Sequence, residues 1–216
     1  MPRFQAQQKV KIEWSSAFAY GIGLMASDGN LHKDGRHMSF KSAEEELIQK
    51  FKLAFGLNNK VTMSARGGEK GKRYLNVFFG DIFFYRFLVT IGITKAKSKT
   101  IKSVKVPDWY FADFLRGVFD GDGTFYTSWD KRWPSSFLFQ IAFASASLDF
   151  IDWLKSKLAR LYGVKGIVCD GSGVFNLRYM KGDTRKLYQV MYYREDLLYL
   201  NRKCNKIRDA FRKDDV

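Results

Sequence analysis

Two aspartates, Asp28 and Asp122, carry the chemistry that is most visible in the sequence. Each ends an apolar run, at residues 18–27 and 114–121, and each is followed by a glycine. We expect both runs to be helices, with the glycine turning the chain into a strand. If the two helix ends meet, the carboxylates repel each other unless a cation lies between them. The pattern therefore predicts a divalent metal site with hard oxygen ligands, which suits Mg²⁺ and the hydrolysis of a phosphodiester.

Small residues would allow the two helices to pack closely against each other. They recur four positions apart at matching places in both runs, as Gly23 and Ser27 in the first and Gly117 and Gly121 in the second. Residues four apart share one face of a helix, so two such faces let the backbones approach closely.

We expect two or three divalent ions to be shared by Asp28 and Asp122, with Ser27 and Gly121 as further candidate ligands.

The elements around these helices occur twice in the same order. Hydrophobic periodicity in each half predicts a helix, two strands, a helix, two strands and a helix. Beyond the motif helices and the alternating stretches that follow them, we expect helices at 43–55, 81–91, 148–161 and 183–193, and strands at 60–65, 73–79, 166–169 and 174–180. The prediction is an α+β fold of two pseudo-symmetric αββαββα halves, packed through the motif helices, whose antiparallel sheets form a saddle.

The halves are expected to span residues 1–94 and 109–216, and the second ends in a basic helix at 195–212. Between them, residues 95–108 contain five lysines and no acidic residue before Asp108, and Pro107 prevents a continuous helix. Two interpretations of this linker stay open. It lies beside phosphates, or it is a solvated run of charge.

Composition points to a nucleic-acid partner. Lys and Arg number 37 against 22 Asp and Glu, which gives a net charge of +15. No apolar run approaches the roughly 18 residues that a membrane span needs, and the N-terminus lacks the pattern of a signal peptide. We therefore expect an intracellular protein, in the cytoplasm of a prokaryote or in an organelle. Two isolated cysteines and two histidines exclude a Cys/His zinc site.

Two motifs resemble a known family. Leu115–Gly123 reads LRGVFDGDG, and Gly21–Gly29 reads GIGLMASDG, with Ala26 where an aspartate is common. With the order of elements, they resemble the LAGLIDADG homing endonucleases of the single-chain type with two motifs. The resemblance implies an intron-encoded monomer that makes a metal-dependent break in double-stranded DNA and leaves short 3′ extensions. It also implies that Asp28 and Asp122 bind the catalytic metal.

The resemblance further implies a basic residue beside each scissile phosphate. Lys97 and Lys203 resemble those positions, and the neighbouring Lys95, Lys99 and Arg202 are the alternatives. A lysine there can stabilise charge on the transition state or polarise the attacking water. A plain phosphate contact is the simpler interpretation.

The strand period of two predicts which side chains read the DNA. Leu31 is expected to face the helices, which places on the DNA side Asn30, His32, Asp34, Arg36, Ser39 and Lys41. The same parity in the second half selects Thr124, Tyr126, Ser128, Asp130, Arg132, Gln140 and Ala142. The hairpin tips add Arg66, Lys70, Lys72 and Arg73 in one half and Ser172, Asn176, Arg178 and Lys181 in the other. Because the two sets differ, we predict a long, non-palindromic target.

A non-catalytic protein on the same scaffold is the alternative. Such a protein would be an RNA maturase or a transcription regulator, and intron RNA would be a second candidate partner. The fold serves both purposes and does not decide between them. Asp28 and Asp122 favour the nuclease, because a protein that only binds gains nothing from two carboxylates held against phosphate.

Overall fold

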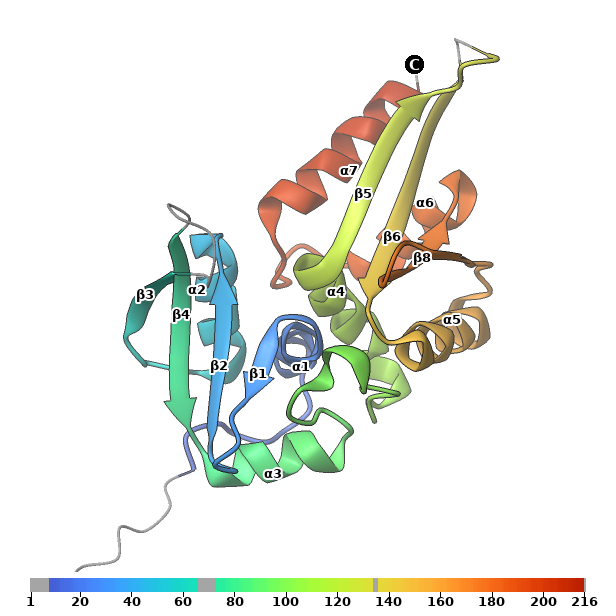
Figure 1. The fold of residues 1–216 in the computed structure, drawn as a ribbon. Coiled ribbons are helices and arrows are strands. Elements are labelled where there is room, and N and C mark those ends of the chain that lie inside the picture. Colours follow the sequence, from blue (N-terminus) through green and yellow to red (C-terminus); the bar gives the residue numbers. More distant parts are fainter. Residues whose placement is uncertain (1–7, 66–72, 134–135, 216) are drawn as a thin grey trace, which may run out of the picture.

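The computed structural model describes residues 8–65, 73–133 and 136–215. The first half contains α1 (Ser16–Ser27), β1 (Gly29–Leu31), β2 (His37–Ser42), α2 (Glu45–Phe55), β3 (Val61–Ala65), β4 (Arg73–Gly80) and α3 (Ile82–Thr90). The second contains α4 (Phe111–Asp122), β5 (Gly123–Trp129), β6 (Phe137–Ser145), α5 (Leu148–Tyr162), β7 (Ile167–Asp170), β8 (Phe175–Tyr179), α6 (Lys181–Met191) and α7 (Asn201–Asp214). The predicted α+β fold with an αββαββα order in each half is confirmed (Figure 1).

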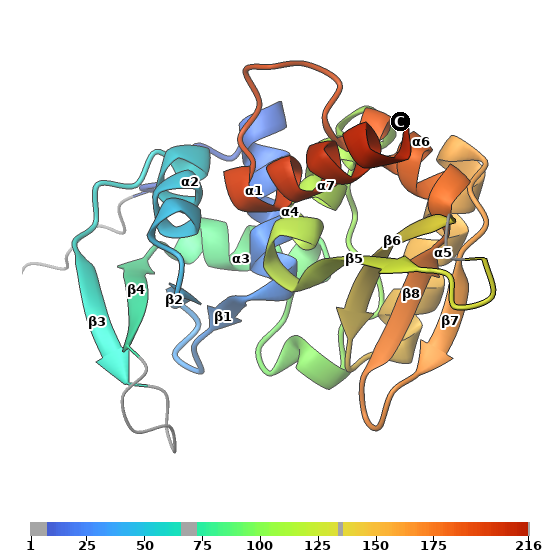
Figure 2. The same ribbon diagram turned by 90° about the horizontal axis from the view of Figure 1, so that it is seen from above.

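Each half folds its strands into one antiparallel sheet. The strand orders are β1-β2-β4-β3 and β5-β6-β8-β7, so the strand that follows each motif helix lies at the inner edge of its sheet. Alternate residues of β6, such as Phe139, Ile141 and Phe143, are buried against helices. Figure 2 shows the helices gathered on one side of both sheets, while the opposite faces of the sheets carry no helix. Two open sheet faces therefore flank the central pair of helices.

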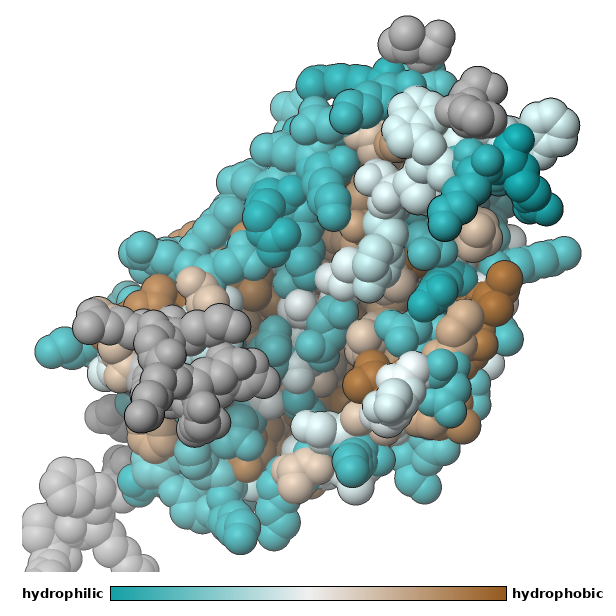
Figure 3. Space-filling view, turned by 45° about the horizontal axis from the view of Figure 1, so that its top comes forward, coloured by the Kyte–Doolittle hydropathy of each residue, from teal (hydrophilic) through white to brown (hydrophobic). Residues whose placement is uncertain are grey.

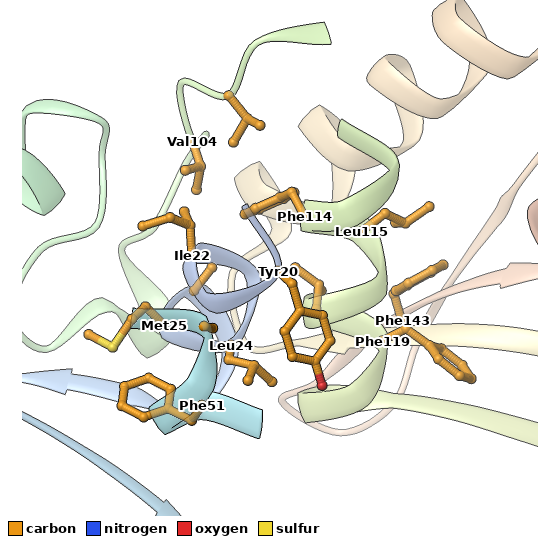
Figure 4. Packing of buried hydrophobic residues seen from close by; sticks show 14 of the residues in the cluster. Tyr20, Ile22, Leu24, Met25, Phe51, Val104, Phe114, Leu115, Phe119 and Phe143 are labelled. Carbon is orange, nitrogen blue, oxygen red and sulfur yellow. The ribbon is translucent and has the colours of Figure 1, made fainter. Parts of the chain in front are cut away.

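The motif helices α1 and α4 pack directly on each other at their glycines. A Cβ atom on Gly23 would lie 2.2 Å from the Phe114 carbonyl oxygen, and one on Gly117 would lie 2.1 Å from the Tyr20 carbonyl oxygen. These contacts are with backbone atoms, so the predicted small-residue faces do meet. Around the contact, side chains of α1 such as Ile22 and those of α4 such as Phe119 extend into the two cores (Figure 4).

Gly117→Ala is expected to lower the free energy of unfolding by about 1–3 kcal/mol, because the added methyl group forces two backbones apart. Gly182→Ala in α6 is the matched control, since a Cβ atom there meets nothing within 4 Å. It should leave stability unchanged or raise it slightly through helix propensity. Urea unfolding of both variants measures the difference. Equal stability of the two variants would contradict the proposed contact.

Local signals explain where the helices begin and end. The Ser15 hydroxyl caps α1 by accepting from the Phe18 amide at 3.1 Å, and the Asp81 carboxylate caps α3 by accepting from the Phe84 amide at 2.9 Å. The helices α2 and α5 end at Gly56 and Gly163, which have φ of +64° and +65°. The two helices end within one residue of the expected positions, 55 and 161.

The C-terminal helix begins later than the sequence indicated. We expected it from Glu195, but α7 starts at Asn201. The Leu198 carbonyl accepts from Arg116 Nε at 2.8 Å, and the Leu200 amide donates to Asp120 Oδ2 at 2.7 Å. These bonds to α4 hold the segment before α7 in a non-helical path, and Leu197 and Leu200 are buried as loop residues rather than on a helix face.

The linker is packed against the molecule rather than freely solvated. Ile101, Val104 and Val106 are buried in the core, and Lys97 is only 6% exposed. The other lysines of residues 95–108 are exposed, so the positive charge lies on one side of an anchored segment. Whether these exposed lysines contact phosphate or are only solvated stays open. Among the described residues, none of the helices is long and apolar enough to cross a bilayer.

The end of the chain also ties the two halves together. At the start of α7, Arg202 Nη2 lies 2.6 Å from Glu44 Oε1, and Asn201 Nδ2 donates to Glu46 Oε1 at 2.6 Å. Both acidic residues lie at the start of α2, in the first half. The contact between the halves therefore includes α7 in addition to the motif helices.

Candidate active site and DNA-facing surface

The two motif helices end side by side. Asp28 is the C-cap of α1, and Asp122 is the last residue of α4. A Cβ atom on Gly121 would lie 2.0 Å from Ser27 Oγ and 3.0 Å from Asp28 Oδ2. The carboxylate of the first motif therefore lies against the last turn of the second, and both aspartates are exposed at the tips.

A lysine contacts the carbonyl end of each motif helix. Lys97 Nζ, from the linker, donates to the Ser27 carbonyl at 2.6 Å. Lys203 Nζ, from α7, lies within hydrogen-bond distance of the carbonyls of Phe119, Asp120, Gly121 and Gly123, at 2.7, 2.9, 3.3 and 2.6 Å. A cation is favourable at a helix C-terminus because the unpaired carbonyls carry partial negative charge. The structure thus brings both predicted lysines to the aspartates.

Burial changes the acid–base properties of these groups. Loss of solvation lowers the pKa of Lys97 and of Lys203, and nearby aspartates oppose that shift. The protein packed behind Asp122 raises the pKa of its carboxyl, an effect that the two lysines oppose. Asp122 is thus exposed on its outer side and poorly solvated on its inner side. A cation at the tips would favour its charged form.

The donor set fits a hard divalent cation. The two carboxylates supply oxygen ligands, and the adjacent carbonyl oxygens of Ser27 and Gly121 are further candidates that here accept from Lys97 and Lys203. In the described part of the chain, no three His, Cys, Asp or Glu side chains gather as a metal cluster. Mg²⁺ is commonly held by one or two carboxylates and completes its shell with water and substrate phosphate. The two aspartates suit that arrangement.

A buried carboxylate lies directly behind the tips. Asp120 is 2% exposed and accepts from the Tyr20 hydroxyl at 2.8 Å and from the Leu200 amide at 2.7 Å. Burial raises the pKa of Asp120 to about 6, and these two hydrogen bonds oppose the shift. Its counterpart in the first motif is Ala26. The difference in sequence between the motifs therefore affects how the second helix is anchored, while both tips keep their aspartate.

The open face of the first sheet contains a hollow beside Asp28. It has a volume of about 280 Å³ and is lined by Asp28, Asn30, His32, Ser39, Lys41, Asn76 and Phe78. Four of these are predicted DNA-reading residues on β1, β2 and the turn after β1. Asn76 and Phe78 of β4 were missed, although the same period of two would have found them, because they alternate with buried Val77 and Phe79.

In the turn between β1 and β2, the predicted DNA-reading residue Asp34 bonds to other residues of the turn. The Asp34 carboxylate accepts from the backbone amides of Arg36 and His37 at 3.1 and 3.0 Å and pairs with the His37 ring. Hydrogen bonding from His37 lowers the pKa of Asp34. The His37 ring stacks on Phe78 at 4.8 Å between centroids. Asp34 therefore shapes the turn that carries Arg36.

The second sheet places most of its predicted readers on one face. Tyr126 pairs with Gln140 across β5 and β6, and Thr124 pairs with Ala142, which in turn pairs with Arg178 on β8. Ser128 and Asn176 continue the same alternation. Ser172 lies in the turn between β7 and β8. The Asp130 carboxylate accepts from the Arg132 amide at 2.8 Å. Ala142 itself is only 2% exposed.

Lys181 is placed differently from the prediction. It begins α6, where its ammonium pairs with Asp214 of α7 and donates to the Phe137 carbonyl at 3.2 Å. The residue faces the helices because α6 starts two residues earlier than the expected position. Of the remaining predicted readers, Arg66, Lys70 and Lys72 lie outside the described residues. For Arg73, only its place at the start of β4 is described.

Solved structures with a similar fold include homing endonucleases and a domain of DUF199/WhiA. The chain resembles the homing endonuclease I-WcaI bound to its DNA recognition sequence, with 14% identity, 89% of this chain and 86% of that one covered, and a TM-score of 0.62. It resembles I-DmoI in complex with DNA and Ca, with 15% identity, 90% and 97% covered, and a TM-score of 0.56. It also resembles the N-terminal LAGLIDADG domain of DUF199/WhiA, with 12% identity, 91% and 88% covered, and a TM-score of 0.57.

No protein-family profile matches the chain, and no curated protein resembles it closely enough in sequence to count as a match. The structural likeness defines the fold. The chain has the LAGLIDADG fold, with two motifs in one polypeptide, as the sequence resemblance implied.

Proposed function

We propose that this protein is a site-specific endonuclease that makes a metal-dependent double-strand break in a long, non-palindromic DNA target. The observation that carries the proposal is the contact of the two motif-helix tips, with Gly121 against Asp28 and a lysine on each helix end. Two exposed carboxylates, with two buried ammonium groups directly behind them and an open sheet face on either side, suit the cutting of phosphodiesters. The solved DNA complexes with this fold support the same partner.

Each group at the tips has a role in this proposal. Asp28 and Asp122 would hold Mg²⁺, which supplies Lewis-acid stabilisation and an activated water when bound. Lys97 lies near both aspartates, and its Nζ orders the Ser27 carbonyl. A partly desolvated ammonium there stabilises negative charge on the phosphate as it is attacked. Lys203 holds the last turn of α4 through four carbonyls, which fixes where Asp122 lies.

The experiment selects a target from a random duplex library and then incubates a plasmid bearing that target with Mg²⁺. We expect a linear product with short 3′ extensions. The solved LAGLIDADG domain of DUF199/WhiA shows that the fold is not confined to proteins described as nucleases. Enrichment of a duplex without cleavage under any divalent ion would therefore identify a non-catalytic DNA-binding protein.

Lys97→Met is expected to slow single-turnover cleavage by about 10²-fold, because removing the ammonium removes charge stabilisation next to both aspartates. Lys95→Met, at an exposed position of the same linker, is the matched control and should affect only the salt dependence of binding. Quench-flow or gel assays at saturating enzyme separate the two effects. An unchanged cleavage rate for Lys97→Met would show that this lysine is structural.

A further inference from the structure

The hairpin that follows the second motif helix is longer than the one that follows the first. The β1–β2 ladder has three residue pairs, from Gly29 with Phe40 to Leu31 with Met38. The β5–β6 ladder has seven, from Gly123 with Phe143 to Trp129 with Phe137. Both ladders begin at a motif-helix tip, and Figure 1 shows the two hairpins diverging from that point. Four extra pairs carry the second hairpin about 13 Å further from the tips.

The extra length is supported by packing. On the helix side, Trp129 packs on Phe137 at 4.9 Å and Phe139 packs on Phe211 of α7 at 5.2 Å, between ring centroids. Lys206 of α7 donates from Nζ to the Phe125 carbonyl of β5 at 2.8 Å. In the described part of the chain, the first half has no counterpart of α7. The second hairpin is therefore held in place along its length by a helix that only the second half possesses.

The outer part of this hairpin presents groups suited to DNA. On the open face of β5, Tyr126 is 47% exposed and Ser128 is exposed. Near the end of the hairpin, the Arg132 side chain is 87% exposed and Trp133 is 68% exposed. Figure 3 shows pale residues of intermediate hydropathy among hydrophilic ones over this end of the molecule. Hydroxyl groups can contact base edges, and Arg can hold phosphate.

We propose that the two half-sites of the target differ in length. The β5–β6 hairpin reaches up to about four base pairs further from the cleavage centre than the β1–β2 hairpin reaches on the other side, since base pairs are stacked about 3.4 Å apart. This inference rests on the proposed DNA binding but not on cleavage. Because the tip of the longer hairpin carries Arg132 and Trp133, these residues are assigned to the outermost contacts.

Hydroxyl-radical footprinting tests the proposal without requiring cleavage. The full-length protein is bound, in Ca²⁺, to the duplex enriched from the random library. A variant in which residues 128–138 are replaced by Asn-Gly keeps the pairs from Gly123 to Thr127 and closes them with a two-residue turn. It should lose about two base pairs of protection on one side only, which identifies the side bound by the second half.

A second variant guards against misfolding of the shortened hairpin. Arg132→Ala combined with Trp133→Ala changes two exposed side chains and should keep the thermal unfolding temperature of the wild type. It should weaken protection at the outermost pairs of the longer side by several-fold and leave the shorter side unchanged. Loss of protection on that side in this stably folded variant supports the proposal, and the same loss in the shortened variant agrees with it.

If the wild type protected the same number of base pairs on both sides of the cleavage centre, the proposal of unequal half-sites would be overturned. The proposed DNA binding would still stand. Unchanged protection in both variants would overturn the assignment of the outermost contacts. Failure to enrich any duplex would overturn this inference together with the proposed function, so the two failures are distinguishable.

Discussion

Asp122→Asn is expected to reduce double-strand cleavage by about 10³-fold or more, which corresponds to about 4 kcal/mol of the activation barrier. The substitution keeps the shape of the side chain but removes a negative charge from the pair formed with Asp28 at the motif-helix tips. A neutral amide holds a divalent cation poorly, so the stabilisation of the attacking and leaving oxygens is lost. Single-turnover plasmid cleavage at saturating Mg²⁺ measures the effect.

DNA binding should survive the same substitution, and removing a carboxylate near phosphate should if anything strengthen it. Asp149→Asn is the matched control, because this exposed aspartate on α5 makes only a 3.7 Å ion pair with Lys102. It should cleave like the wild type. If Asp122→Asn still cut both strands at the wild-type rate, the assignment of the helix tips as the catalytic centre would be wrong.

Arg116→Met is expected to lower the free energy of unfolding by about 3–5 kcal/mol. Arg116 is fully buried, and its guanidinium donates to Asp113 Oδ1, to the Met191 carbonyl and to the Leu198 carbonyl, at 2.7, 2.7 and 2.8 Å. Asp113 is itself 1% exposed. Removing the arginine leaves a buried carboxylate without its counter-charge, together with two carbonyls that lose a donor.

Chemical denaturation of Arg116→Met beside Arg212→Met tests this expectation. Arg212 is 79% exposed and pairs with Asp209 on the same helix at 3.3 Å, so its loss should change stability by less than about 1 kcal/mol. Comparable stabilities of the two variants would mean that the buried ion pair contributes little net free energy.

The sequence predicted the elements that rest on local periodicity and on glycine. The pairing of the motif helices followed from small residues four apart, and the structure confirms it through Gly23 and Gly117. The open sheet faces followed from alternation along the strands. Both signals lie within one element, so they can be read without knowing how distant parts of the chain meet.

The parts that the sequence did not predict depend on contacts between distant segments. Lys203 bonds to four carbonyls of α4 and its following strand, some 80 residues away along the chain. The late start of α7 depends on two hydrogen bonds with α4, one accepted by the Leu198 carbonyl from Arg116 and one donated by the Leu200 amide to Asp120. Lys181 was assigned to a DNA-reading hairpin tip, but it begins α6 and pairs with Asp214 of α7. Tertiary contacts of this kind override local propensity.

The buried hydrogen bond between Tyr20 and Asp120 limits how the two halves could be recombined. Counted from Gly23 and Gly117, Phe114 occupies the place in the second motif that Tyr20 holds in the first. A homodimer built from two copies of the second half would set each Asp120 opposite a phenyl ring that has no hydroxyl to donate. Two copies of the first half would have Ala26 there, so each Tyr20 hydroxyl would lose its acceptor. Gene duplication of either half alone would therefore not recreate this interface without compensating substitutions.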